Sequence, residues 1–128
     1  KILSKMAPGG RENKFYAKIF QALRIEINDE LSALRDLLEQ ATDLLEEGGR
    51  LVVISYHSLE DRLVKHFMRS GNFEDKQEQD LKGKVLAPFK PVIRKAISAS
   101  AEEVLSNPRA RSARLRVAER TDFSKKSC

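Results

Sequence analysis

The chain has 128 residues, of which 41% are hydrophobic and 34% are charged, and its net charge is +5. This composition is typical of a soluble globular domain, and the lack of a signal peptide or of a run of about eighteen apolar residues argues against secretion and membrane insertion. The one cysteine is Cys128, the last residue, so neither a disulfide framework nor a cysteine-based metal site can form within one chain. A reducing cytoplasm fits this pattern.

Residues 1–15 include a Pro-Gly-Gly sequence and show little periodicity, which predicts a loop or the frayed end of another element. From about Phe15, apolar residues recur at steps of three and four, and this stripe predicts about thirty residues of helix. The stripe consists of Phe20, Leu23, Ile27, Leu31, Leu34, Leu38, Ala41 and Leu45. Gly48-Gly49 ends it. Because this length exceeds that of most globular helices, the pattern allows either two helices or one that extends beyond its domain.

The segment LVVISY at 51–56 has one polar and three β-branched residues without alternation, which predicts a central strand covered by helices on both faces. A helix over 58–69 is expected next, with Ser58 as its N-cap and Asp61 as the capping-box partner. Gly71 ends this helix. Helix, strand and helix therefore alternate through short connections, as they do in an open α/β sheet.

Residues 72–84 are highly charged, which predicts a surface loop or a mobile segment. The next segment contains Pro88 and Pro91, which cannot donate to a strand ladder, so we expect it at a sheet edge or outside the sheet. Ser100 and Glu103 have the spacing of a capping box for a short helix. Alternation over 113–118 then predicts a half-buried terminal strand.

The excess positive charge is confined to residues 107–128, where seven Lys and Arg face two Asp and Glu. Five of the seven are arginines, whose guanidinium groups suit bidentate contact with phosphate. These are Arg109, Arg111, Arg114, Arg116 and Arg120. The segment fits either a phosphate-facing patch on a nucleic-acid binder or a solvated basic tail, and charge alone does not decide between them.

A dense polar cluster, Tyr56-His57-Ser58, follows the strand at 51–56. In open α/β sheets, ligands bind beyond the carboxyl ends of the strands, so we interpret His57 and Ser58 as candidate substrate contacts. The structural alternative makes Ser58 a helix cap and gives His57 only a hydrogen bond within the loop. For Glu60 and Asp61 we prefer a purely structural role at the start of the helix, because carboxylates are favoured at the positive end of a helix.

Other kinds of site have less support. Gly48-Gly49 precedes a strand, whereas phosphate and dinucleotide loops require a strand followed by a helix. His57 and His66 are too far apart to form a metal pair on one helical turn, so no metal is assigned. Ser58 lacks the Gly-x-Ser-x-Gly turn of a hydrolase.

Three segments together resemble one family: FQALRIEINDEL at 20–31, GGRLVVISYHSLEDRLVKHFM at 48–68 and NPRARSARLRVAER at 107–120. They are similar to the C-terminal part of the bacterial 16S ribosomal RNA (cytosine-N4)-methyltransferases, which use S-adenosylmethionine. The resemblance implies an α/β fold, the C-terminal part of a Rossmann-like methyltransferase sheet with the end of a helical insertion. Residues 1–15 would end the insertion or form a loop, and 16–128 would complete the methyltransferase domain.

The resemblance also implies that the glycine-rich cofactor loop lies upstream, so no residue of this chain is assigned to S-adenosylmethionine and the chain alone is expected to be inactive. His57 and Ser58 would orient the cytosine, supported by Asp61 and Arg62. Contacts with RNA or support of the pocket would come from Gln21, Arg24, Asn28, Asn107, Arg109 and Arg111. For the first three, an ordinary polar helix face is an equal alternative.

The implied partner is 16S rRNA or the small ribosomal subunit in the cytoplasm, with no role for DNA or a membrane. Missing strands would leave an unpaired sheet edge, so a homodimer or strand-exchanged self-association of the chain is expected. One alternative is a non-catalytic RNA-binding or ribosome-associated module. Another is a purely structural fragment of a sheet.

Overall fold

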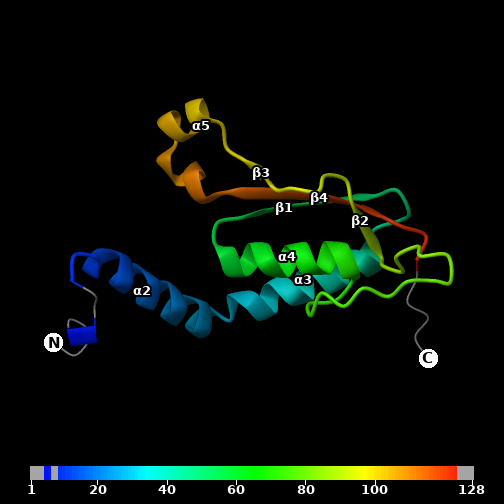
Figure 1. The fold of residues 1–128 in the computed structure, drawn as a ribbon, viewed down its shortest axis with the longest axis horizontal. Helices are drawn as coiled ribbons and strands as arrows, with labels where there is room; N and C mark the ends of the chain where they lie inside the picture. The colour runs from blue at the N-terminus through cyan, green and yellow to red at the C-terminus, as the bar shows by residue number, and fades with distance from the viewer. Residues whose placement is uncertain (1–4, 7–8, 124–128) are drawn as a thin grey trace. The chain divides into compact units, whose positions relative to one another are not determined.

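The computed structural model describes residues 5–6 and 9–123, which fall into two units divided between Leu34 and Arg35. The second unit contains a small sheet and the helices that cover one of its faces (Figure 1). None of the helices in the described ranges has the length and apolar character needed to span a bilayer.

The apolar stripe expected from about Phe15 forms two helices, α2 (Glu12–Asn28) and α3 (Glu30–Leu44). Between them, Asp29 adopts a left-handed conformation with φ 49° and ψ 37°, which ends α2 because a right-handed helix cannot continue through it. The sequence allowed either one long helix or two helices, and the structure contains two. Helix α2 also begins earlier than expected, and residues 1–4 and 7–8 of the expected N-terminal loop lie outside the described residues.

The sheet is antiparallel throughout, and its central strand is the last in the sequence. Its strands are β1 (Arg50–Ser55), β2 (Phe89–Pro91), β3 (Ile97–Ser98) and β4 (Arg114–Arg120). Strand β4 pairs with β1 on one side and with β2 and β3 on the other. The predicted order of helix, strand and helix is confirmed, and the Pro-containing segment supplies the short strand β2 at the edge, as expected.

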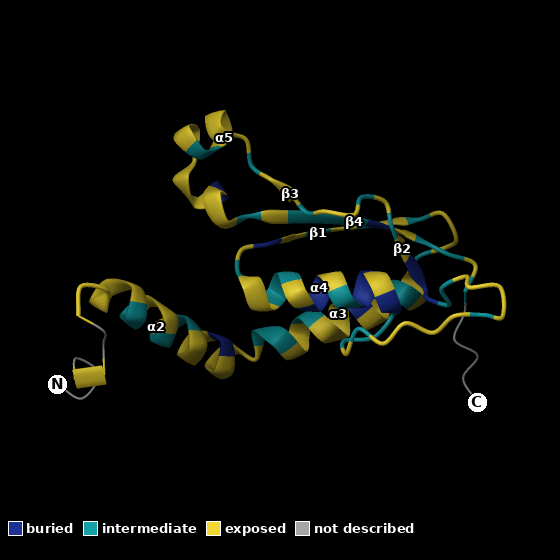
Figure 2. Ribbon diagram, in the orientation of Figure 1, coloured by how far each residue is buried: buried dark blue, intermediate teal, exposed yellow. Residues whose placement is uncertain are grey.

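Helix α4 (Ser58–Ser70) lies along one face of the sheet and supplies more buried hydrophobic side chains than any other described element (Figures 1 and 2). Its side chains Val64 and Met68 are 1% and 2% exposed, and Phe67 packs against Phe89 of β2 with ring centroids 6.0 Å apart. Burying each such side chain contributes about 1.5–3 kcal/mol. The helix ends at Gly71, whose φ of 75° favours glycine.

The opposite face of β1 is exposed, so the expectation of a strand covered on both faces is wrong for the described residues. Val52 and Ile54 are 54% and 53% exposed, whereas Ser55 on the α4 side is buried. Because side chains alternate along a strand, the partners Val117 and Leu115 lie on the same exposed face as Val52 and Ile54. Within the described ranges, the outer edge of β1 pairs with no other strand.

The two connections outside the sheet are held by side-chain hydrogen bonds. In the charged segment 72–84, Asn72 Oδ1 accepts from the backbone N–H groups of Glu74 and Lys76, and Asp80 Oδ1 accepts from two further backbone N–H groups. Ser100 caps the short helix α5 (Ala101–Ser106), as the capping box predicted. A 3-10 helix, η1 (Pro108–Ser112), then leads into β4.

Candidate functional site

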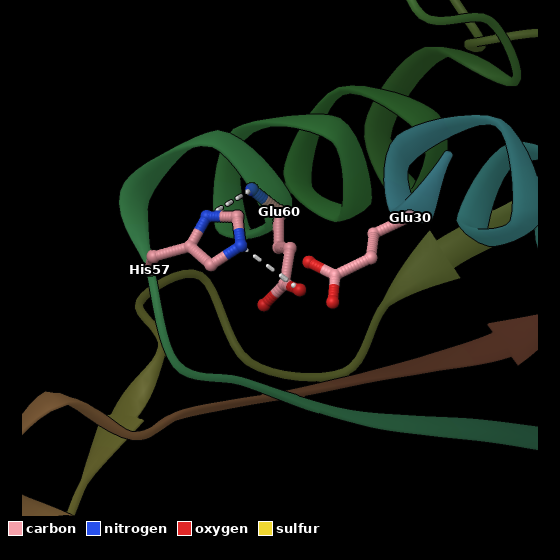
Figure 3. Close-up of side chains that lie close together, drawn as sticks. All are labelled: Glu30, His57 and Glu60. Atoms are coloured by element: carbon pink, nitrogen blue, oxygen red, sulfur yellow. Dashed lines mark hydrogen bonds and ion pairs between the residues drawn. The ribbon is translucent and has the colours of Figure 1, made fainter. Parts of the chain in front are cut away.

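The N-cap of α4 is His57, and not Ser58 as the sequence analysis expected. His57 has extended backbone angles, and its Nδ1 atom accepts a hydrogen bond from the backbone N–H of Glu60 at 3.4 Å (Figure 3). Ser58 is therefore the first helical residue, and its side chain is not needed as the cap. The imidazole takes this role because its unprotonated ring nitrogen can satisfy one of the free N–H groups at the start of a helix.

The carboxylate of Glu60 closes the turn between β1 and α4. One oxygen accepts from the backbone N–H of Tyr56 at 3.2 Å, and the other lies 3.0 Å from His57 Nε2 (Figure 3). The side chain of His57 is 9% exposed. Among the described residues, the buried Nε2 atom makes no hydrogen bond of good geometry, although the Glu60 carboxylate lies close to it. The sequence predicts Glu60 only near the positive end of the helix, and its contacts with Tyr56 and His57 carry no signal that was recognised there.

Asp61 forms a bidentate ion pair with Arg116 of β4. The two N–O distances are 2.7 and 2.9 Å, and the side chains are only 15% and 21% exposed for Arg116 and Asp61. The pair therefore fastens the first turn of α4, which carries His57 and Ser58 at its start, to the central strand. The arginine side of β4, and not its Leu115 and Val117 side, faces α4.

The five tail arginines do not form one patch. The guanidinium of Arg120 donates to four backbone carbonyls, those of Thr42, Pro88, Thr121 and Phe123, at 2.6–3.1 Å. Arg116 is occupied by Asp61, and Arg114 donates to Ser98 Oγ at 2.9 Å. These contacts remove Arg116 and Arg120 from the predicted phosphate-facing surface. Lys125 and Lys126 lie outside the described residues.

Arg109 and Arg111 are exposed on η1, as is Arg62 on α4. Asn107 caps η1, because its Oδ1 accepts from the backbone N–H of Arg109 at 3.3 Å. This contact gives Asn107 a structural role and leaves the two arginine side chains available to a ligand.

The remaining candidates, Gln21, Arg24 and Asn28, lie on α2 in the first unit. Arg24 pairs with Glu30 of the same unit at 3.3 Å. The pair is exposed on the arginine side and therefore adds little stability. His57, Ser58 and the other candidates belong to the second unit.

The residues present do not fit a cofactor-phosphate loop. Such a loop needs a glycine-rich turn from a strand to a helix. The connection from β1 to α4 is Tyr56-His57, without glycine, and Gly48-Gly49 precedes β1.

Comparison with known proteins gives a consistent result. The family model described as the MraW methylase family matches residues 1–121. The protein named Ribosomal RNA small subunit methyltransferase H from Amoebophilus asiaticus is 58% identical over 120 residues, covering 94% of this chain and 39% of that protein. The protein of the same name from Cytophaga hutchinsonii is 60% identical over 119 residues, covering 93% and 40%. The chain thus spans about two fifths of the length of these curated relatives.

Proposed function

The chain belongs to the MraW methylase family, and on that premise we propose that it is the C-terminal part of an enzyme that methylates the N4 amine of a cytosine in small-subunit ribosomal RNA. The observation that carries this proposal is the 58% identity over 120 residues to a ribosomal RNA small subunit methyltransferase H. The methyl donor would be S-adenosylmethionine, bound mainly by sequence outside this chain. An rRNA substrate would place the enzyme in the cytoplasm.

The proposed reaction transfers an already activated methyl group, so the protein has mainly to position the accepting amine. The target base must also leave its stack, which costs a few kcal/mol and requires polar and stacking groups around it. We propose that His57 and Ser58 provide part of this pocket. The support is their place at the carboxyl end of β1, together with the exposed position of Ser58.

Further residues are proposed to support the pocket or to contact RNA. Asp61 would hold the first turn of α4 through Arg116, and Arg62 would lie beside it on the exposed side of the helix. The proposed RNA contacts are Gln21, Arg24, Asn28, Asn107, Arg109 and Arg111. Of these, Arg109 and Arg111 have the clearest support, because both are exposed on η1.

We also propose that the isolated chain self-associates through the outer edge of β1. An exposed strand edge presents unpaired N–H and C=O groups to a second chain. The neighbouring face of β1 is apolar, with Val52 and Ile54 both more than half exposed. Sedimentation velocity at increasing concentration should show a dimer, and a strictly monomeric chain would argue against this proposal.

A chimera tests the enzymatic proposal directly. The 120 matching residues of the Amoebophilus asiaticus protein would be replaced by those of this chain. The purified chimera would be incubated with small ribosomal subunits and labelled S-adenosylmethionine, and the digested RNA would be analysed for N4-methylcytidine by mass spectrometry. We expect methyl transfer to the cytosine amine, and none from the 128-residue chain alone.

The His57→Ala chimera should turn over about 10- to 100-fold more slowly, because a loosened pocket misaligns the amine. Lys82→Gln, in the exposed loop, is the control and should retain the full rate. A folded chimera that binds RNA but transfers no methyl group would favour the non-catalytic RNA-binding module. Methylation of a different atom would refute the proposed specificity.

A further inference from the structure

A pocket of about 540 Å³ lies between α4 and the segment that joins β2 to β3. It forms where that segment leaves the sheet. The backbone N–H of Val92 still donates to the carbonyl of Val117 at 2.9 Å, but regular pairing with β4 resumes only at Ile97. The central strand therefore has a stretch without a paired neighbour on this side, and the pocket opens next to it.

The charged side chains that line this pocket are all cationic. They are Lys65 and Arg69 of α4, Arg94 of the β2–β3 connection and Arg116 of β4. Lys90 also lines the pocket, but it is the cross-strand partner of Glu119, so its side chain belongs to the other face of the sheet. Among the described residues that line the pocket there is no Asp or Glu. Apolar residues, including Pro91 and Ile93, complete its wall.

Two of these four charges are compensated within the described part of the chain. Arg69 forms a bidentate pair with Asp75 at 2.6 and 2.9 Å, and Arg116 is paired with Asp61. Lys65 and Arg94 form no ion pair with any described residue. Two such positive charges beside one concavity repel each other, and a bound anion would relieve this repulsion.

We propose that this pocket binds a backbone phosphate of the RNA substrate, with the adjoining nucleoside against Pro91 and Ile93. This assignment rests on the proposed function. Arg94 can contact two phosphate oxygens at once, while Lys65 acts as a point charge. A nucleotide combines a phosphate with an apolar ring face, which matches a cationic pocket that has an apolar wall.

The pocket is connected to the candidate site through Arg116. The same guanidinium lines the pocket and holds Asp61 in the first turn of the helix that His57 caps. A phosphate held here would therefore anchor the RNA beside the element that carries the proposed base pocket. It would act as a positioning contact, separate from the exposed arginines of η1.

An RNA-binding assay tests this proposal. Fluorescence anisotropy measures the binding of an end-labelled single-stranded RNA oligonucleotide to the 128-residue chain at a series of salt concentrations. The test variant is Lys65→Gln with Arg94→Gln. The matched control, Lys82→Gln with Lys84→Gln, removes the same charge from the exposed loop. Circular dichroism would verify that both variants fold.

We expect the pocket variant to bind at least about tenfold more weakly than the control, since one or more charge-assisted contacts are lost. Its salt dependence should flatten by about 0.7 in slope for each phosphate contact removed. A charge-retaining variant, Lys65→Arg with Arg94→Lys, should recover most of the affinity.

The remaining outcomes separate the two proposals. If the pocket variant and the control lost RNA affinity equally, the proposed phosphate site would be refuted, but the proposal of an RNA substrate would not. Absence of RNA binding by the unmodified chain at low salt would overturn the pocket, whereas the proposed function is decided by the chimera assay. Inorganic phosphate is finally titrated into the chain by calorimetry. If phosphate bound as tightly as the RNA, the pocket would be a site for free phosphate and not for RNA.

Discussion

Breaking the ion pair between Asp61 and Arg116 should destabilise the fold by more than the loss of an ordinary surface pair. The proposed changes are Asp61→Asn, Arg116→Gln and the two combined, which form a double-mutant cycle. The pair makes two hydrogen bonds, at 2.7 and 2.9 Å, and its side chains are 15% and 21% exposed.

The expected size follows from this partial burial. Exposed pairs contribute about 0.2–1 kcal/mol. Removing one partner of a fully buried pair costs about 3–5 kcal/mol. A pair exposed by about one fifth lies between these limits, so we expect each single change to cost about 2 kcal/mol, with a coupling energy of about 1.5 kcal/mol. For a chain of this size, 2 kcal/mol corresponds to a fall in Tm of roughly 8 °C.

Urea and thermal unfolding, followed by circular dichroism, measure the cost of each single change and the coupling energy. The pair between Arg50 and Glu119 provides the matched control, because it also joins charged residues in the sheet but is 3.6 Å long and 63% and 48% exposed. Its coupling energy should stay below about 0.5 kcal/mol. If the cycle of Asp61 and Arg116 gave an equally small value, the assignment of Arg116 as the fastening of α4 to β4 would be refuted.

Three further predictions concern other positions. Gly71→Ala should cost about 2–4 kcal/mol in unfolding experiments, because φ is 75° and an added β-carbon would lie 2.5 Å from Pro88 Cδ; an unchanged midpoint would contradict this. Arg120→Lys should cost about 2–4 kcal/mol, since one ammonium cannot donate to all four backbone carbonyls. Unchanged stability in the same assay would exclude a structural role for these hydrogen bonds. Arg109→Ala with Arg111→Ala should flatten the salt dependence of RNA binding by about 0.7 per contact, and an unaltered slope would leave them a structural role only.

Periodicity was sufficient to predict the elements around β1, but not their environment. The apolar run at 51–56 and the spacing of apolar residues in 58–69 predicted a strand and a helix that the structure contains as β1 and α4. The same run could not show that one face of β1 would be exposed in this chain. An unbroken apolar pattern reports which surfaces are suited to burial, and the covering elements have to be supplied by other parts of the sequence.

The roles of individual polar residues were harder to predict, because they depend on partners distant in the sequence. Arg116 meets Asp61 across 55 positions, and Arg120 meets Thr42 across 78. Neither contact leaves a local signal, so both arginines were counted as basic tail. His57 was missed as a cap because side-chain oxygens usually fill that position. An imidazole with an unprotonated nitrogen can also accept a backbone N–H at the start of a helix. Glu60, three residues after His57, has the spacing of a capping-box partner.

Under the proposed self-association, the edge of β1 that pairs with no other described strand would make the stability of this chain depend on mass action. Any partner that binds the folded chain along that edge, including another copy, adds to the apparent free energy of unfolding as its concentration rises. Melting temperatures of the isolated chain should therefore be compared only at equal protein concentration. A polypeptide carrying the complementary strands of a relative would compete with such pairing, and the two pieces could then be assayed together as a split enzyme.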